Sequence, residues 1–410
     1  MKGKAAWLAS AAVVALVFSS AAAQAGSNDP KWSEQQAGPS NADLEARIEA
    51  LEAELQNAEI RQAKDRDAYA SAASKLDGWW SNTSISGRMY FDITNVDHDV
   101  NGVKGTDNGI GFDIKRFYFG VDHKFDDVWS ANLTTDFQYD STAKVTQLYI
   151  KKAYLRANIS PALDVRLGST DLPWVPFAEG VYGYRHIENT LIDRTKFGTS
   201  ADWGVHASGK FGGMFEYAVA VINGAGYKAP PGSNNATHFK SVDVEGRLSA
   251  KVDDFVLAVG GYTGKLGKDV QGAVTHHTAT RFDALAAYKT KTITLGVEYF
   301  YGSDWNNVTT IASDKAQGWS GFASYQFDPQ WSVFGRYDWV QPNQDTNSPL
   351  KDKYFNVGVQ WSPTKIVDLS LVYKHDEADH GTLATSNGTI GGAVVGGSYD
   401  EVGIFGQLRW

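Results

Sequence analysis

The sequence of 410 residues contains no cysteine and no basic cluster, and beyond its first residues it has no apolar run long enough for a membrane-spanning helix. The absence of cysteine excludes disulfides, thiol catalysis and cysteine-ligated metals, and it fits a chain that crosses an oxidising compartment without using disulfides. A helical membrane protein is excluded as well. The formal charge is −9 with no basic cluster to offset it, so nucleic acid is excluded as a partner.

The first residues have the features of an export signal. Lys2 and Lys4 form a basic start, residues 5–18 are apolar, and small residues at 23–25 precede Gly26. A membrane anchor is the alternative, but the apolar run is shorter than the roughly 20 residues that span a bilayer core of about 30 Å. We therefore predict a cleaved signal peptide over residues 1–25 and a linker over 26–40.

A heptad pattern follows the linker. Leu44, Ile48, Leu51 and Leu55 recur at alternating spacings of four and three, with charged residues between them. This pattern predicts a coiled-coil helix over residues 41–77, and a helix that pairs with copies of itself would make the protein an oligomer. A single amphipathic helix lying on another surface is the alternative.

From Gly78 onward the hydrophobic period changes from that of a helix to two, which is typical of strands with one apolar and one polar face. The last strand shows the alternation best, since Val402, Ile404 and Leu408 share a face that ends in Trp410. Sixteen strands are predicted, at 85–95, 110–124, 128–139, 146–159, 162–170, 202–210, 215–222, 242–252, 255–263, 280–289, 292–301, 317–327, 330–340, 353–361, 366–374 and 400–410.

The links between these strands alternate in length. Very short links such as 126–127, 253–254 and 328–329 alternate with much longer ones. Short turns at one rim and long loops at the other are typical of outer-membrane β-barrels, and the mixture of aromatic, glycine and polar residues suits strands between lipid and a wet lumen. A soluble β-sandwich would alternate too, but it has no reason to segregate its link lengths.

The longest link, 171–201, is too apolar and aromatic to extend freely into water. A long ordered loop is usually functional, so we expect it to fold inward and narrow the lumen. The alternative is a lid or a packing surface between protomers. The candidate pore residues on this segment are Glu179, Tyr182, Tyr184, Arg185, Arg194 and Lys196.

A family resemblance rests on the same segment. Pro173-Trp174, Glu179-Gly180 and the run 182–185 (Tyr-Gly-Tyr-Arg) resemble the third outer loop of the phosphate-selective porin O/P family, and 114–120 resembles that family's second strand. The resemblance covers most of residues 78–410. It implies a sixteen-stranded, trimeric, passive channel whose third outer loop forms the constriction.

The predicted wall of the pore carries charges of both signs. If the polar face of the first strands points inward, the wall contributes the bases Arg88, Arg116, Lys152, Arg156 and Arg166 and the acids Asp92, Asp122, Asp136 and Asp164. This balance leaves a phosphate preference undecided. Arg185 and Arg194 have two possible roles, because they either attract anions or pair with Glu179, Glu188 and Asp193 and staple the loop.

Other sequence features support weaker hypotheses. The run 375–380, expected in the last outer loop, and the pair His276-His277 could hold a metal, but solvated loop charges explain them better, and neither a metal nor a cofactor is predicted. The glycine-rich run 391–397 has no strand-to-helix context for a phosphate-binding loop and is predicted to be a flexible loop tip. The sequence has no Gly-x-Ser-x-Gly motif to support a lipid-hydrolysing barrel, so we expect no enzyme. The coiled coil could also tether the barrel to peptidoglycan.

Together these patterns predict an all-β transmembrane barrel of about sixteen antiparallel strands over residues 78–410, in the outer membrane of a Gram-negative bacterium. The expected partners are outer-membrane lipid, two further copies of the chain, small hydrophilic solutes or anions, and peptidoglycan.

Overall fold

The computed structural model describes residues 40–106, 108–140, 144–228, 238–393 and 395–410. The predicted signal peptide and nearly all of the predicted linker lie outside these ranges. The chain divides after Ser74 into two units.

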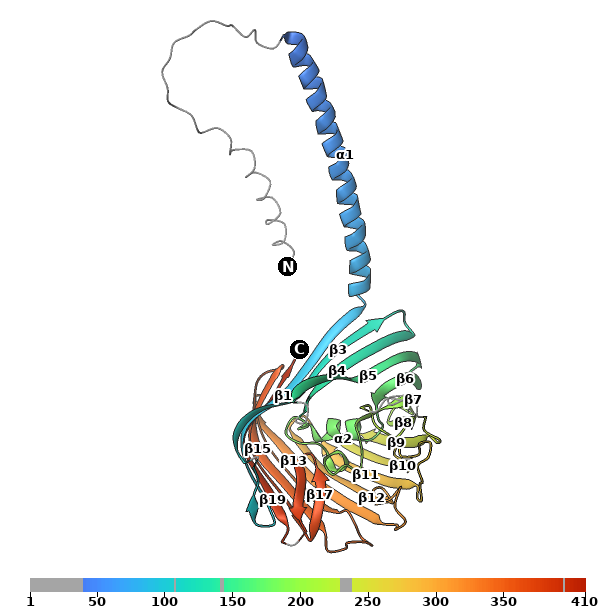
Figure 1. Cartoon of the computed structure of the whole chain (residues 1–410), viewed down its shortest axis with the longest axis vertical. Helices are drawn as coiled ribbons and strands as arrows, with labels where there is room; N and C mark the ends of the chain where they lie inside the picture. The colour runs from blue at the N-terminus through green and yellow to red at the C-terminus, as the bar shows by residue number, and fades with distance from the viewer. Residues whose placement is uncertain (1–39, 107, 141–143, 229–237, 394) are drawn as a thin grey trace, which may run out of the picture. The chain divides into compact units, whose positions relative to one another are not determined.

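Helix α1 (Asn41–Trp80) is continuous over its 40 residues (Figure 1). It begins with a reciprocal cap, because the backbone N–H of Asp43 donates to the hydroxyl of Ser40 and the backbone N–H of Ser40 donates to the carboxylate of Asp43. The heptad residues Leu44, Ile48 and Leu51 are exposed along it. The helix is confirmed, whereas its pairing in a coiled coil stays a prediction. No helix among the described residues is long and apolar enough to cross a membrane.

The second unit is a β-barrel. Sixteen long antiparallel strands are hydrogen-bonded in sequence order within the described residues, and pairing of the first with the last closes the ring. They are β1 (Thr83–Val100), β3 (Gly109–Lys124), β4 (Trp129–Asp140), β5 (Val145–Ser160), β6 (Leu163–Asp171), β7 (Ala201–Phe211), β8 (Phe215–Ile222), β9 (Asp243–Val252), β10 (Phe255–Gly264), β11 (Ala279–Lys289), β12 (Ile293–Ser303), β13 (Lys315–Asp328), β14 (Trp331–Gln341), β15 (Lys351–Thr364), β16 (Val367–Asp379) and β19 (Gly397–Arg409). Each matches a predicted strand, so the fold class is confirmed. Short strands β2 (Val103–Lys104), β17 (Gly381–Thr385) and β18 (Gly388–Gly392) lie in the long connections.

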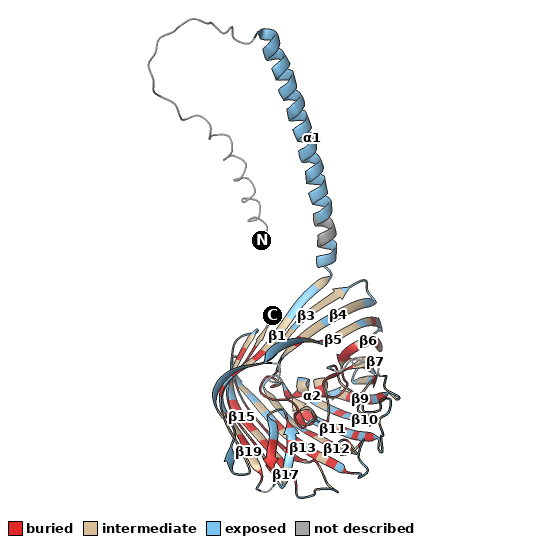
Figure 2. Ribbon diagram, viewed as in Figure 1, coloured by how far each residue is buried: buried red, intermediate tan, exposed pale blue. Residues whose placement is uncertain are grey.

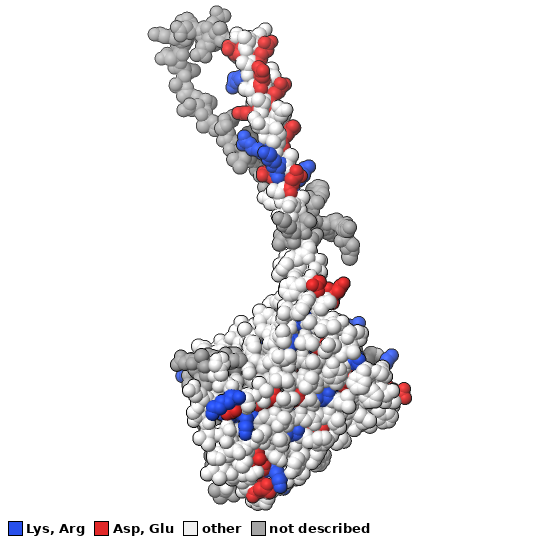
Figure 3. Space-filling view, turned by 90° about the vertical axis from the view of Figure 1, so that its right-hand side faces the viewer, with Lys and Arg blue, Asp and Glu red and all other residues white. Residues whose placement is uncertain are grey.

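Burial alternates along the strands as the period of two predicts (Figure 2). In β14, Phe334, Arg336 and Asp338 are buried inside the barrel, whereas Val333 and Tyr337 are exposed on its outer surface. Figure 3 shows one face of the barrel with few charged side chains, as a surface in contact with lipid requires.

Two predictions about the last long connection were wrong. Residues 375–379 were expected in a loop, but they continue β16, because its ladders with β15 and β19 extend to Asp379 and Ala378. The glycine-rich run 391–397 was expected to be a flexible tip. Instead Gly391 and Gly392 end β18 and Gly397 begins β19, and a Cβ on Gly391 would lie 2.2 Å from the carbonyl oxygen of Gly381. Close approach of two strands accounts for this glycine.

Candidate functional site: a pore narrowed by an inner loop

The connection between β6 and β7, residues 172–200, is called here the inner loop. It contains two short helices, α2 (Val175–Tyr182) and α3 (Leu191–Arg194). Pro176 lies in the first turn of α2, where its missing N–H costs nothing. Gly183 ends α2 in the left-handed conformation (φ 86°) and its N–H donates to the carbonyl of Glu179 at 2.9 Å.

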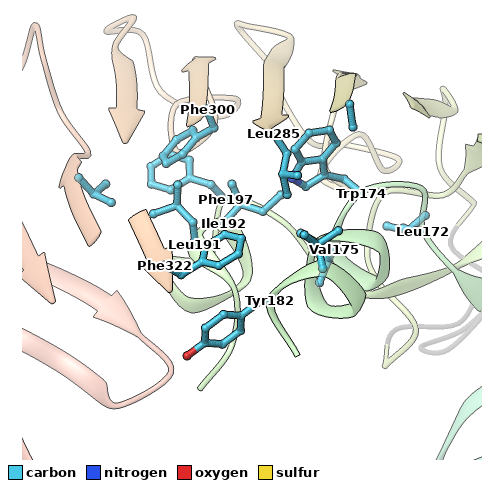
Figure 4. Packing of buried hydrophobic residues seen from close by; sticks show 14 of the residues in the cluster. Leu172, Trp174, Val175, Tyr182, Leu191, Ile192, Phe197, Leu285, Phe300 and Phe322 are labelled. Atoms are coloured by element: carbon cyan, nitrogen blue, oxygen red, sulfur yellow. The ribbon is translucent and has the colours of Figure 1, made fainter. Parts of the chain in front are cut away.

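The inner loop lies within the barrel and supplies 11 of the 27 buried residues of its main apolar cluster. Trp174, Leu191 and Ile192 are buried against wall residues that include Leu285 and Phe300 (Figure 4). A sixteen-stranded ring is too wide for its wall side chains to meet, so the loop fills one side of the lumen. The predicted inward fold is confirmed.

Polar contacts fix the loop to the wall. Trp174 donates its backbone N–H to Glu245 at 2.9 Å and its indole N–H to Glu298 at 2.8 Å. Four wall cations donate to loop carbonyls: Arg247 to Pro173, Lys289 to Gly180 and Val181, Arg336 to Asn189, and Arg281 to Phe197. These bases therefore hold the loop, and none was identified from the sequence.

Arg194 is fully buried at the end of α3. Its guanidinium donates to Asp338 at 2.9 Å, to Asp352 at 2.5 Å and to Asp376 at 3.1 Å, and it lies over the ring of Tyr354 at 4.5 Å. Each acid comes from a different wall strand. A side chain enclosed in this way is not available to a passing ion, so the geometry favours the stapling role over the steering role.

The other predicted loop residues divide between the wall side and the lumen side. Tyr182 and Tyr184 are buried, and their hydroxyls contact Asn356 at 3.2 Å and Ser332 at 3.1 Å. Arg185 is partly exposed and pairs with Glu179 at 2.5 Å. Lys196 is exposed and takes a left-handed backbone conformation (φ 65°). Of the predicted loop bases, Arg185 and Lys196 reach the lumen and Arg194 does not.

The predicted wall arginines lie on the opposite side of the lumen, on β1, β3, β5 and β6. Arg88 donates to the hydroxyl of Tyr90 at 3.2 Å. Arg156 and Arg166 both pair with Asp164, the latter at 3.1 Å. Arg156 and Arg166 lie along one wall, but Asp164 offsets one of their two positive charges.

Arg116 contacts the carboxylate of Asp136 at 3.3 Å and the hydroxyl of Tyr149 at 3.2 Å. Next to it Lys115 also faces inward, and its ammonium lies 3.0 Å from Asp92. Two successive cations share one face because a β-bulge interrupts the alternation at this point of β3.

A second bulge occurs in β5, where Lys151 and Lys152 both point inward. Lys152 pairs with Asp171 at 2.5 Å, whereas the ammonium of Lys151 donates to the hydroxyl of Tyr118 at 3.1 Å and lies 4.4 Å from the centre of that ring. Lys115 and Lys151 were missed by the sequence analysis, because strict alternation places both on the lipid side.

The open part of the lumen lies between the inner loop and strands β1, β3 and β4. It is a cavity of about 960 Å³ whose lining includes Arg116, Arg185, Lys196 and Lys228. These four cations are called here the basic side of the cavity. They come from the wall, from the inner loop and from the connection after β8.

The acids Glu188 and Glu401 line the same cavity and are called here the acidic side. Both are already paired with lysines in a network of salt bridges. Lys374 lies 3.4 Å from Glu188 and 3.0 Å from Glu401, and Lys115 lies 3.6 Å from Glu401. Burial opposes ionisation of Glu188, but Lys374 and Lys115 outweigh it and lower the pKa of Glu188 to about 2. The acids are thus ionised and already paired.

The two histidine-containing runs lie away from this cavity. His375 contacts Asp400 at 2.8 Å, and the ring of His277 contacts the carbonyl of Ile311 at 3.0 Å. Across the described ranges, no three His, Asp or Glu side chains are arranged to hold a metal ion.

The barrel is similar to several solved outer-membrane structures. An anion-selective porin from Comamonas acidovorans matches with a TM-score of 0.58 and 13% identity, over 80% of this chain and 99% of that one. The outer membrane channel DcaP of Acinetobacter baumannii matches with a TM-score of 0.57 and 13% identity, over 80% and 97% of the two chains. The chain has the porin fold. A trimer form of OmpT from Vibrio cholerae shares it at 12% identity, with a TM-score of 0.56 over 80% of this chain and 99% of that one.

No family model and no curated protein matches the sequence. At these identities the likeness concerns the fold, which is that of the outer-membrane barrels of Gram-negative bacteria.

Proposed function

We propose that the protein is a porin of the outer membrane of a Gram-negative bacterium, through which small hydrophilic solutes diffuse passively and unchanged, with a preference for anions. The porin fold and a wide cavity beside the inner loop support a channel. The inner loop makes a constriction, because it fills the side of the lumen next to β9–β16.

The observation that carries the anion preference is an uneven distribution of paired charge around the cavity. On the acidic side, Glu188 and Glu401 pair with lysines at 3.0 to 3.6 Å. On the basic side, Lys196 lines the cavity and has no carboxylate within 4 Å in the part of the chain that the structure describes. Lys196 therefore adds a positive charge to the cavity that no nearby carboxylate offsets, and a narrow low-dielectric pore focuses this charge.

The resemblance of the inner loop to the phosphate-selective porin O/P family suggests phosphate as one of these anions. However, Asp136, Asp164 and Asp171 neutralise much of the arginine and lysine charge on β3, β5 and β6. We therefore propose a general preference for small anions, of which phosphate is one.

We further propose that three copies assemble. The exposed heptad residues of α1 need an apolar partner, and a trimer form of OmpT has the same fold. On the sequence argument, we also propose that this helix contacts peptidoglycan.

Single-channel recording in planar bilayers tests the function. We expect stepwise conductance and, in a potassium chloride gradient, a reversal potential of the sign set by chloride. Adding phosphate should reduce the chloride current if phosphate enters the same pore. Purified, folded protein that gives no conductance steps would overturn the proposal, and a reversal potential set by potassium would overturn its anion preference.

A further inference from the structure

Strands β3 and β4 of the barrel wall are hydrogen-bonded to each other over only part of their length. Their ladder covers six register pairs, from Lys124↔Ser130 to Phe119↔Thr135. Beyond it β3 stays paired with β1 as far as Gly109, and β4 stays paired with β5 as far as Asp140. Two facing strand edges, 109–118 and 136–140, therefore have no ladder partner among the described strands. We call these edges the β3–β4 seam.

Asp136 closes the ladder at the point where the seam begins. Its buried carboxylate accepts the backbone N–H of Phe117 at 3.3 Å and that of Phe137 at 2.9 Å, so one side chain contacts both strands. It also accepts the hydroxyl of Tyr149 at 2.9 Å. The point where β3 and β4 separate is called here the fork. The specific hydrogen bonds of Asp136 at the fork indicate that the separation of the two strands is part of the fold.

Beyond the fork the β4–β5 hairpin is held by another part of the chain. Tyr149 of β5 stacks on Tyr227, which follows β8, with ring centres 6.0 Å apart. The ammonium of Lys228 lies 4.9 Å from the centre of the Tyr149 ring. These contacts replace the ladder with β3 as the support of this hairpin.

The seam connects the lumen with the outer surface of the barrel. All residues from Gly109 to Asp113 are exposed, including those on the lumen side of the alternation, and Ile110 and Phe112 are 83% and 61% exposed. The cavity that contains Arg116 and Lys196 is also lined by Ile110 and Phe112. In this single chain the residues that the structure describes leave an opening in the side of the pore.

A lipid bilayer cannot cover such an opening at low cost. Each backbone N–H or C=O left without a partner in hydrocarbon costs several kcal/mol, and lipid tails offer no hydrogen bonds. A polypeptide can pair with the edges and pack against the apolar side chains on them. A second copy of this chain is a polypeptide available to every pore in equal amount.

We propose that a second copy of this chain covers the β3–β4 seam, so that each pore wall is completed by its neighbour. This inference rests on the proposed channel and its trimer, and it specifies which part of the wall lies inside the assembly. The contact is heterologous, because the seam of one copy meets a different surface of the next, and three such contacts close a ring. The exposed heptad residues of α1, such as Leu51, give an independent reason for copies to associate.

Photo-crosslinking in native membranes tests the proposal, and the chain has no cysteine of its own to interfere. Ile110→Cys is labelled with a benzophenone maleimide, irradiated, and boiled in detergent before electrophoresis. We expect a band shifted from the monomer to the dimer mass, with the partner peptide mapped to this chain. The matched control is Val297→Cys on β12, which is 55% exposed and lies about half-way round the ring. It should yield no dimer band.

Adducts with lipid alone would overturn the proposal and show that the seam opens to the membrane, and adducts with a different protein would overturn it too. Phe112→Cys provides a second probe if the first variant does not fold. Conductance of the unlabelled Ile110→Cys variant separates this inference from the channel function. Conductance without a crosslink contradicts only the seam contact, whereas a crosslink without conductance contradicts only the channel.

Discussion

The indole N–H of Trp174 donates to the carboxylate of Glu298, a residue 124 positions later in the chain, at 2.8 Å. This bond joins the start of the inner loop to β12 on the far wall. Both groups are buried, so neither can replace its partner with bulk water.

Trp174→Phe keeps the aromatic ring and removes this hydrogen bond. Loss of a bond to a buried carboxylate costs roughly 1.5 to 3 kcal/mol, so we expect a looser inner loop and a larger single-channel conductance. The control is Trp319→Phe, because Trp319 is exposed on the outer surface of β13. Equal conductance of both variants would show that this bond does not set the width of the pore.

Arg194→Met removes the one guanidinium shared by Asp338, Asp352 and Asp376. Breaking a buried ionic cluster by removing one partner typically costs about 3 to 5 kcal/mol, which should appear as a lower urea midpoint of the barrel in lipid vesicles. Lys353→Met is the control, since its pairs with Glu377 and Asp379 are exposed and should contribute less than about 1 kcal/mol. A urea midpoint unchanged by Arg194→Met would exclude the stapling role.

Lys196→Gln removes one charge from the lining of the cavity, and Lys151→Gln removes an inward-pointing charge of the wall strand β5. We expect each to shift the reversal potential towards that of cations, and the double variant to shift it further, most clearly at low salt where screening is weak. Lys210→Gln removes an exposed charge near the turn after β7 and should leave ion preference unchanged. Unchanged selectivity in the double variant would contradict the proposed source of the anion preference.

His186 on the inner loop should make folding sensitive to acid. Burial, assisted by Arg409, Arg88 and Arg185 and opposed by Asp368, lowers the pKa of His186 to about 3. Between this value and its ordinary pKa of 6.5 the unfolded chain binds the extra proton. His186 therefore weakens the fold as the pH falls through this interval, by at most about 1.4 kcal/mol per pH unit.

His186→Gln should flatten the pH dependence of the free energy of unfolding between about pH 4 and about pH 6. The exposed His276 provides a control, and His276→Gln should leave the slope as it is. The same slope in both variants would mean that His186 is protonated in the folded barrel.

Deletion of residues 41–77 tests the predicted coiled coil. If the heptad residues Leu44, Ile48, Leu51 and Leu55 hold copies together, the shortened protein should dissociate to monomers at lower temperature in mild detergent. The double variant Leu51→Ala with Leu55→Ala should also dissociate at lower temperature. Glu52→Ala, which lies outside the heptad positions, should not. A full-strength trimer after deletion would assign the assembly to the barrel walls.

Most of the barrel could be predicted from the sequence, because a strand between lipid and water must alternate and a hairpin rim needs short turns. The inner loop was also predictable, since a long segment with Trp174, Phe177 and Tyr184 cannot remain in water. Local pattern was sufficient in both cases.

The details of the site depend on contacts between distant residues and could not be predicted. Bulges turned Lys115 and Lys151 inward against the alternation, and no local residue marks either bulge. Asp376 was placed in a loop because the predicted strand ended at residue 374, so its meeting with Arg194, 182 positions away, was missed. Arg185 and Arg194 looked equivalent in sequence, and only tertiary contacts separate them.

The contacts of the inner loop also constrain the order of events during assembly. The loop is made directly after β6, yet the residues that receive it, including Leu285, Phe300 and Phe334, belong to strands synthesised later. If strands are added to the barrel in chain order, the aromatic residues of the loop remain unpacked until the later strands have been added. Bulky apolar residues in this state are prone to aggregation, so a chaperone in transit has more reason to bind this segment than any hairpin of the wall.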